Sequence, residues 1–248
     1  MTAGIKTIAV TGASRGIGAG IALELARRGF TVGCLTRKGR GIEGADGAGT
    51  AGRFINVACD VTDEASMTSA FAELAARAGA LNGLVNNAGI HRADPSHELA
   101  TASFEKVMAT NVTAVFAACR EAYPHLVNSG GGIIVNIGSF FAKLGVKRNL
   151  AYCASKAAVG AITRCLAVEW AGKGIRVLDV APGYIVTDLT RKPLSEGPLA
   201  EFLKKRIPSG TPGTTGDVAK LVAAIFSEDI PFLTGETIYL DGGQGIAH

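Results

Sequence analysis

The sequence predicts a single doubly wound α/β domain, in which a parallel seven-stranded sheet is covered by helices on both faces. Short apolar runs alternate with longer stretches of helical periodicity, which is typical of a parallel sheet buried on both sides. A glycine-rich turn follows the first apolar run, and no internal repeat or break in composition divides residues 1–248. The expected strands are 5–10, 30–36, 54–60, 83–86, 132–137, 175–181 and 237–240.

Helices are expected between these strands. Gly29 should end the first helix, where a left-handed residue is wanted, and Thr62 is the expected N-cap of the second. Two segments fit neither pattern: 37–52 is rich in glycine and alanine and reads as a mobile loop, and 188–215 contains four prolines. Loops as long as the second usually carry function. The expected helices are 17–28, 64–78, 101–123, 152–172 and 216–227.

The composition of the chain disfavours several classes of protein. The apolar stretches of this 48% hydrophobic chain fall short of the roughly 20 residues that span a bilayer. No cationic segment with a long apolar run opens the chain, so we expect no signal peptide, no membrane partner and a cytoplasmic location. The five cysteines form no C-x-x-C pair, so neither a disulfide framework nor a metal site is expected. The basic residues behind the net charge of +4 are spread along the chain, which disfavours nucleic acid as the main partner and is compatible with anionic ligands such as phosphates.

Tyr152 and Lys156 are the most informative pair of residues. Their i, i+4 spacing puts them on one face of a helix, one turn apart. An ammonium beside a phenol favours the phenolate, so Lys156 should lower the tyrosine pKa and make Tyr152 a proton donor and acceptor near neutral pH. Taken alone, the spacing fits an amphipathic helix surface equally well. Ser139, thirteen residues before Tyr152, ends a predicted strand and can donate a hydrogen bond to a substrate oxygen.

The glycine-rich turn predicts a phosphate cradle. It follows an apolar strand and opens a helix, so the free N–H groups of the helix N-terminus face any anion bound there. Gly12 permits the tight turn, Gly16 lets the backbone approach a pyrophosphate, and Gly18 allows close packing of helix on strand. The cradle comprises Gly12, Ser14, Arg15, Gly16, Ile17 and Gly18.

The end of the second strand indicates which dinucleotide binds. A carboxylate there would bond the ribose 2′-hydroxyl and repel a 2′-phosphate, but the strand ends in Thr36, Arg37 and Lys38. The planar fork of arginine suits a phosphate monoester. We therefore expect NADP(H), with Arg15 and Arg37 as phosphate ligands and Thr36 assisting, although Arg37 and Lys38 could instead be a solvated loop.

Together these motifs resemble the short-chain dehydrogenase/reductase family. Besides the glycine turn and Tyr-x-x-x-Lys, the chain carries Asn86-Asn87-Ala88-Gly89 and an ending Gly235-Glu236-Thr237 followed by Asp241-Gly242-Gly243. The resemblance implies a Rossmann-type domain, a homotetramer and a substrate lid at 188–215. It also implies a catalytic tetrad of Asn111, Ser139, Tyr152 and Lys156.

The resemblance assigns roles within the tetrad and names further cofactor contacts. Lys156 would also bond the nicotinamide ribose, and Asn111 would hold a water linking Lys156 to solvent. Two residues depart from the family pattern: Leu178 stands where an Asn is usual, and Asp179 is an acid in an otherwise apolar strand. The further implied contacts are Asp60, Val61, Asn87, Ala88, Gly89, Pro182, Gly183, Ile185 and Thr187.

The substrate is less clearly indicated. The nearest resemblance is to β-ketoacyl thioester reductases, but the basic residue that carrier-protein reductases present before the Ser-bearing strand is missing at Asn128. A small ketone is therefore a rival to the thioester, and His91 either borders the entrance or is a surface residue. The expected apolar pocket is Phe140, Phe141, Val146, Leu150, Tyr184 and Leu189.

Three functions compete. The main hypothesis is NADPH-dependent reduction of a carbonyl to a secondary alcohol, with Tyr152 as the proton donor. The first alternative is an NAD(P)-dependent dehydrogenase that oxidises a sugar, cyclic or aromatic alcohol. The second is a catalytically silent cofactor-binding scaffold, which the intact tetrad disfavours.

Overall fold

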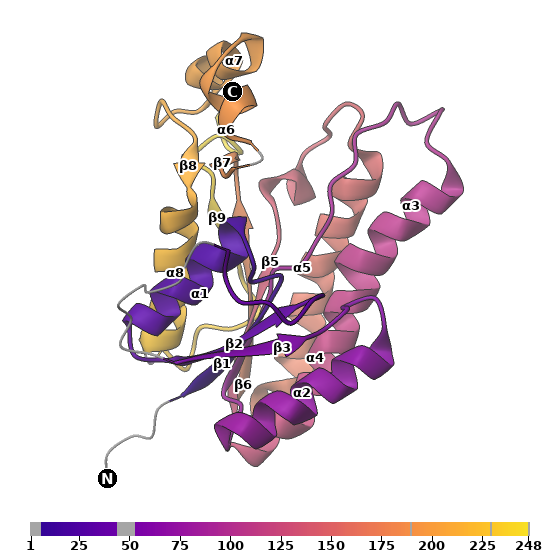
Figure 1. Cartoon of the computed structure of the whole chain (residues 1–248). Helices are drawn as coiled ribbons and strands as arrows, with labels where there is room; N and C mark the ends of the chain where they lie inside the picture. Colours follow the sequence, from indigo (N-terminus) through magenta and orange to yellow (C-terminus); the bar gives the residue numbers. More distant parts are fainter. Residues whose placement is uncertain (1–5, 44–52, 189, 229, 248) are drawn as a thin grey trace.

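The computed structural model describes residues 6–43, 53–188, 190–228 and 230–247, and it confirms the predicted fold class. Seven parallel strands form one sheet in the order β3-β2-β1-β4-β5-β6-β9, flanked by helices (Figure 1). The chain order reverses between β1 and β4, which is the switch point where ligands of doubly wound sheets bind. The strands are β1 Thr7–Thr11, β2 Thr31–Thr36, β3 Phe54–Ala58, β4 Gly83–Asn86, β5 Gly132–Ile137, β6 Ile175–Pro182 and β9 Thr237–Leu240.

Two helical layers bury the two faces of the sheet. Alternate residues of β1 point to opposite faces, so Ile8 and Val10 join one apolar cluster and Ala9 joins the other. The first cluster lies under α1 (Gly16–Arg27) and α8 (Thr215–Ser227). The second lies under α2 (Glu64–Ala78), α4 (Ala114–Asn128) and α5 (Leu150–Trp170). No described helix is long and apolar enough to cross a membrane.

The helix ends confirm one prediction and correct another. Gly29 follows α1 with φ of +90°, as expected of a helix terminator. The predicted N-cap at Thr62 is wrong: Asp63 caps α2, and its carboxylate accepts from the N–H groups of Ala65 and Ser66. The Thr62 hydroxyl instead donates to Asp60 at 2.7 Å.

The helix predicted at 101–123 is three consecutive pieces. α3 (Thr101–Met108) passes through a π-helical turn, Ala109–Thr113, into α4. α4 continues through Pro124 to Asn128, because the residues beyond the proline still pack on the core, with Leu126 fully buried. A π-helical turn inside a helix often marks a functional site, and this one contains Asn111.

The segment after β6 rises above the carboxyl edge of the sheet (Figure 1). Short strands β7 (Ile185–Val186) and β8 (Gly213–Thr214) pair beneath it. Leu194, Leu203 and Ile207 pack into a separate small cluster. Of the predicted loop at 37–52, residues 44–52 lie outside the described part. The remaining helices are α6 Arg191–Ser195, α7 Pro198–Arg206 and the 3₁₀ turns Phe140–Lys143 and Ala171–Lys173.

Candidate active site

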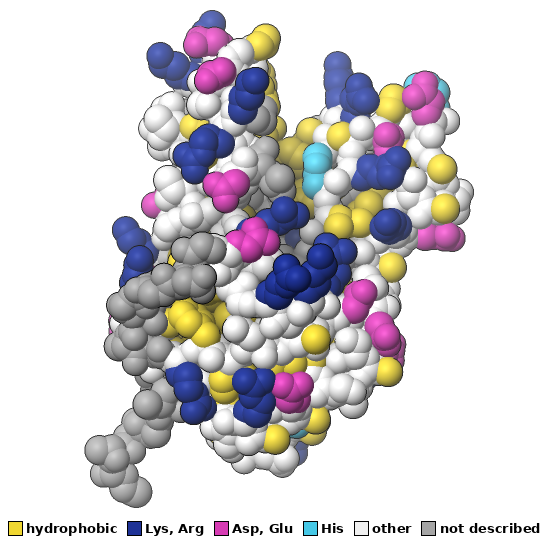
Figure 2. Space-filling view, in the orientation of Figure 1, with side chains coloured by type: hydrophobic (Ala, Val, Ile, Leu, Met, Phe, Trp, Pro, Cys, Tyr) yellow, Lys and Arg dark blue, Asp and Glu magenta, His cyan; other side chains and the backbone are white. Residues whose placement is uncertain are grey.

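Two adjoining hollows occupy the carboxyl edge of the sheet at the switch point. One, of about 540 Å³, runs from the end of β2 to the glycine turn, and the other, of about 350 Å³, continues to Tyr152. Figure 2 shows the cleft between two lobes, with hydrophobic side chains in its floor and Lys and Arg side chains along its border. Both hollows share the wall formed by Ile17, Asn87, Gly89, Ile90 and Thr187.

The glycine turn is shaped to receive an anion. Gly16 adopts φ of +59°, which non-glycine residues rarely adopt, and it is the first residue of α1, which has no side-chain cap. Helix N–H groups without a side-chain partner can bind an anionic oxygen. The Asn87 amide donates to the carbonyls of Thr11 at 3.0 Å and Gly12 at 3.2 Å and so holds the turn in place. The residues here fit the pyrophosphate of a dinucleotide.

Most of the predicted cofactor residues line the larger hollow. Gly18 does not line it: a Cβ there would lie 2.4 Å from Asn87 Nδ2, in keeping with its predicted packing role. Pro182, Gly183 and Ile185 border the smaller hollow. The predicted residues that line the larger one are Gly12, Ser14, Arg15, Gly16, Ile17, Thr36, Arg37, Asp60, Val61, Asn87, Ala88, Gly89 and Thr187.

Two exposed arginines border the larger hollow where a 2′-phosphate would sit. Arg15 and Arg37 are both on its lining. Hydrogen bonds from Thr62, and then the nearby Arg37 charge, hold the pKa of Asp60 below its usual range. The Thr36 hydroxyl donates to the Arg40 carbonyl at 2.8 Å, so its proton already supports the turn after β2. Its assisting role stays a prediction.

Ser139, Tyr152 and Lys156 meet in the smaller hollow. Burial raises the pKa of Tyr152 above its ordinary value, while the neighbouring Ser139 hydroxyl opposes this. The sequence predicted a lowered value, but the Lys156 ammonium lies 5.7 Å from the ring centre and donates to the Ile137 carbonyl at 2.6 Å. Burial lowers the pKa of Lys156 to about 8.

Asn111 is bonded on both sides of its amide. Its Oδ1 accepts from the Ile90 N–H at 2.9 Å, and its Nδ2 donates to the Ile90 carbonyl at 2.9 Å and to Ser155 Oγ at 3.1 Å. The π-helical turn thus fixes the loop that follows Gly89 and joins it to α5. The predicted role of holding a water for Lys156 stays a prediction.

The substrate end of the cleft has an aromatic wall. The rings of Phe140, Phe141 and Tyr184 contact one another, with ring centres 4.8–6.1 Å apart. His91 packs edge-on against Tyr152 at 4.8 Å, which places it in the site rather than on a free loop. Val146 and Leu150 are not part of this wall, and Leu189 lies outside the described residues. The predicted residues found in it are Phe140, Phe141 and Tyr184.

Thr190 is a residue of this site that was not predicted from the sequence. Its hydroxyl donates to the Ile185 carbonyl at 2.7 Å and accepts from the Thr187 N–H at 2.8 Å, closing the turn that carries Thr187. The sequence contained a clue to this turn, because threonine side chains can bond nearby backbone groups and Thr190 follows Thr187 by three residues. Leu194 of α6 also lines the hollow and was missed.

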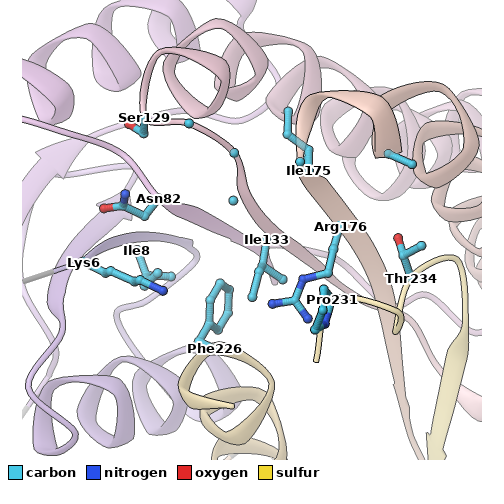
Figure 3. Close-up of a pocket in the computed structure, with 15 residues that line it drawn as sticks. Lys6, Ile8, Asn82, Ser129, Ile133, Ile175, Arg176, Phe226, Pro231 and Thr234 are labelled. Carbon is cyan, nitrogen blue, oxygen red and sulfur yellow. The ribbon is translucent and has the colours of Figure 1, made fainter. Parts of the chain in front are cut away.

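A third hollow, of about 450 Å³, lies at the opposite, amino-terminal edge of the sheet. In Figure 3, Lys6 and Arg176 point toward Phe226 from two sides. Arg176 donates to the Ile230 carbonyl, and Ile8, Ile133 and Phe226 form an apolar floor. None of the predicted site residues lines it.

Comparison with known proteins identifies the family. Residues 12–244 match the family described as enoyl-(acyl carrier protein) reductase. D-threitol dehydrogenase of Mycolicibacterium smegmatis is 35% identical over 243 residues, covering 97% of this chain and 93% of the relative. The 3-oxoacyl-[acyl-carrier-protein] reductase of Homo sapiens is 37% identical over 238 residues, covering 96% of this chain and 97% of its own.

Solved structures agree with the sequence relatives. The crystal structure of a gluconate 5-dehydrogenase from Burkholderia cenocepacia, in complex with NADP and tartrate, superposes with a TM-score of 0.90 and 30% identity. The superposition covers 98% of this chain and 96% of the other. These likenesses span the whole cleft at the carboxyl edge, and the chain belongs to the short-chain dehydrogenase/reductase family of oxidoreductases.

Proposed function

We propose that this enzyme reduces a carbonyl to a secondary alcohol with NADPH, at the junction of the two hollows on the carboxyl edge. The main support for the proposal is that the two hollows join into one cleft. A hollow bordered by Arg15 and Arg37 opens directly into one that holds Ser139, Tyr152 and Lys156. A cofactor site and an acid–base site thus share one continuous cleft.

NADP(H) is the cofactor of this enzyme, and when bound it supplies or accepts the hydride. The N-terminus of α1 would hold the pyrophosphate. Arg15 and Arg37 would hold the 2′-phosphate, and Asp60 and Val61 would contact the adenine. No carboxylate ends β2 to repel that phosphate, since Thr36 is followed by Arg37 and Lys38.

Three side chains would divide the proton chemistry. The Ser139 hydroxyl donates a hydrogen bond to the carbonyl oxygen and holds it beside Tyr152. The Tyr152 phenol gives its proton to that oxygen as carbon gains a hydride, and it takes the proton back in the reverse direction. The buried Lys156 ammonium stabilises the phenolate left after transfer. The raised pKa of Tyr152 keeps the phenol protonated before the reaction, which suits a proton donor.

We propose that the substrate is a β-ketoacyl thioester or a small ketone, covered by the segment 188–215. The aromatic wall of Phe140, Phe141 and Tyr184 favours an apolar substituent on the carbonyl. Basic residues end α7 above the cleft and suit an anionic carrier such as a CoA ester. The likeness to a human 3-oxoacyl-[acyl-carrier-protein] reductase supports the thioester.

A second candidate is oxidation of a polyol or sugar alcohol by the same residues run backwards. The likeness to D-threitol dehydrogenase favours it. In this direction the Tyr152 phenolate would remove the hydroxyl proton. The aromatic wall, which offers few groups to bond several hydroxyls, disfavours it.

We further propose a homotetramer in the cytoplasm. Exposed apolar side chains lie on α4 and α5, at Phe116 and Val168, and near the C-terminus, at Phe232 and Ile246. Such side chains suit contacts between subunits. The five cysteines carry free thiols, as is usual in a reducing compartment.

The test is the initial rate of NADPH consumption with acetoacetyl-CoA, run beside NADH and a panel of free ketones. NADPH with the thioester should be fastest. Turnover of free ketones alone would move the substrate to small ketones. If only NADP⁺ with polyols is turned over, the reductive proposal fails and the second candidate replaces it.

A further inference from the structure

Asp179 is a buried acid that the reaction described above does not use. It stands on β6 in register with Asn136 of β5 and Thr237 of β9, and its side chain is 0% exposed. Its Oδ2 accepts from the Thr237 hydroxyl at 3.2 Å, whereas its Oδ1 has no hydrogen-bond partner in the described part of the chain. A carboxylate buried in this way costs free energy unless an opposite charge lies near.

The carboxylate lies against the backbone of Gly138. A Cβ at that position would be 2.3 Å from Asp179 Oδ1, so only glycine leaves room for the acid. The Gly138 N–H donates to the Val180 carbonyl at 2.8 Å, and its nearness to the carboxylate opposes the rise in the pKa of Asp179. Gly138 separates Ile137, whose carbonyl accepts from Lys156, from the catalytic candidate Ser139.

Asp179 and Lys156 therefore reach the same strand end from two elements. Along β6, Leu178 and Val180 join the cluster under α1 and α8, and Val177 joins the one under α5, so alternation turns Asp179 toward α5. Lys156 is also buried, with one hydrogen bond, to the Ile137 carbonyl, within the described residues. A buried ammonium needs an anionic partner to keep its proton.

We propose that Asp179 is the buried counter-charge that keeps Lys156 protonated, and that it acts on catalysis as a positioning residue through Lys156. This role rests on the proposed function only for its effect on turnover, since the charge pairing itself needs neither cofactor nor substrate. It also gives a reason for an acid among the buried apolar residues that follow Arg176 in β6.

The pKa shifts of the two groups agree with this role. Burial lowers the pKa of Lys156 to about 8, and the Asp179 charge opposes that shift. Burial raises the pKa of Asp179 to about 6, and the Lys156 charge is the first influence that opposes it. Both groups are therefore charged between those values. The other titratable groups around the pair are Tyr152, Cys153 and Arg164 of α5, Lys143 of the 3₁₀ turn, and Tyr239 and Asp241 at the end of β9.

Arg164 is the competing cation. Its Nη1 and the Thr237 hydroxyl lie 3.6 and 3.8 Å from the Cβ position of Gly160, so it approaches Asp179 from the outside. Arg164 is exposed, however, and solvent screens its charge. Arg164→Gln is therefore the matched control, because it removes a positive charge near Asp179 without touching Lys156.

The experiment is a ¹³C NMR titration of the lysine Cε resonances in the full chain without cofactor, with Lys156 assigned by Lys156→Arg. Lys156 should titrate near pH 8 in the wild type. In Asp179→Asn it should titrate at least about one pH unit lower, because an opposite charge is lost from the same buried region, where solvent screens it little. In Arg164→Gln the titration midpoint of Lys156 should stay within about 0.3 pH unit of the wild-type value, as expected for loss of a screened surface charge. An unchanged Lys156 titration in a folded Asp179→Asn variant overturns the proposal.

Two further measurements complete the test. If Asp179→Asn does not fold, Asp179→Ala decides: it removes the same charge with a smaller side chain, so Lys156 should again titrate at a lower pH. An unchanged Lys156 titration in that variant overturns the proposal. In the reductive assay, the high-pH loss of kcat/KM should move with the NMR titration. Absence of any NADPH turnover in the wild type contradicts the proposed function alone, because the NMR result stands without it.

Discussion

The hollow at the amino-terminal edge of the sheet, about 450 Å³, is larger than the 350 Å³ hollow that holds Tyr152 at the carboxyl edge. The amino-edge hollow has two cations and an apolar floor, and Arg176 is already bonded to the Ile230 carbonyl. The carboxyl-edge hollow gathers a phenol, a hydroxyl and a buried ammonium beside an uncapped helix. The carboxyl-edge hollow is therefore distinguished as the active site by side chains that can transfer a proton, and not by its volume.

Among the variants considered, Tyr152→Phe should have the largest effect on activity, and it tests whether the proton-transfer groups of the carboxyl edge form the active site. The variant keeps the ring and its contact with His91 but loses the proton that the carbonyl oxygen needs. Reductive kcat should fall by about 10²–10⁴-fold, the usual contribution of a general acid. NADPH binding, followed by its fluorescence, should be retained. Activity close to that of the wild type would remove Tyr152 from the chemistry.

Arg37→Ala tests the cofactor end of the cleft. Loss of a charge-assisted contact with a 2′-phosphate should lower kcat/KM for NADPH by about 10- to 100-fold. The value for NADH, which has no such phosphate, should change little. Equal effects on both cofactors would show that Arg37 supports the loop instead of reading the phosphate.

The pH dependence of the wild type tests the acid–base pair. The reductive reaction needs Lys156 protonated, so activity is present below its pKa of about 8 and is lost as the pH rises through it. Above that value kcat/KM should fall by about tenfold per pH unit. A plateau that extends to pH 10 would mean that Lys156 keeps its proton or is not needed.

Arg176→Gln, at the amino edge, should have the smallest effect. It removes the contact with Ile230 and one of the two cations of that hollow. Kinetic parameters should stay within about twofold, and the free energy of unfolding should fall by no more than about 1 kcal/mol, as for an exposed charged contact. A large change in kcat/KM would assign the amino edge a part in substrate binding.

The features that could be predicted from the sequence depend on residues close together in the chain. The apolar runs identified the sheet strands, and the i, i+4 spacing of Tyr152 and Lys156 placed both on one helix face in one hollow. The glycine turn likewise runs into the start of α1, at Gly16. Each of these depends on residues close together in the chain, which is why periodicity and spacing suffice.

What the sequence could not predict depends on burial and on distant partners. The pKa of Tyr152 is raised because desolvation outweighs the Ser139 hydrogen bond, and the degree of burial cannot be read from a four-residue spacing. Asp179 meets Thr237 only because β6 and β9 are neighbours, 58 positions apart in the chain. The π-helical turn around Asn111 also depends on its bonds to Ile90 and Ser155.

Amide hydrogen exchange of the full chain with and without NADPH tests directly where the cofactor binds. We expect NADPH to slow exchange in the glycine turn and first turn of α1, at residues 12–18, and in the loop 87–90. Exchange at residues 129–133 of the amino-edge hollow should not change. Protection by NADPH at 129–133, with none at 12–18, would contradict the assignment of the active site to the carboxyl edge.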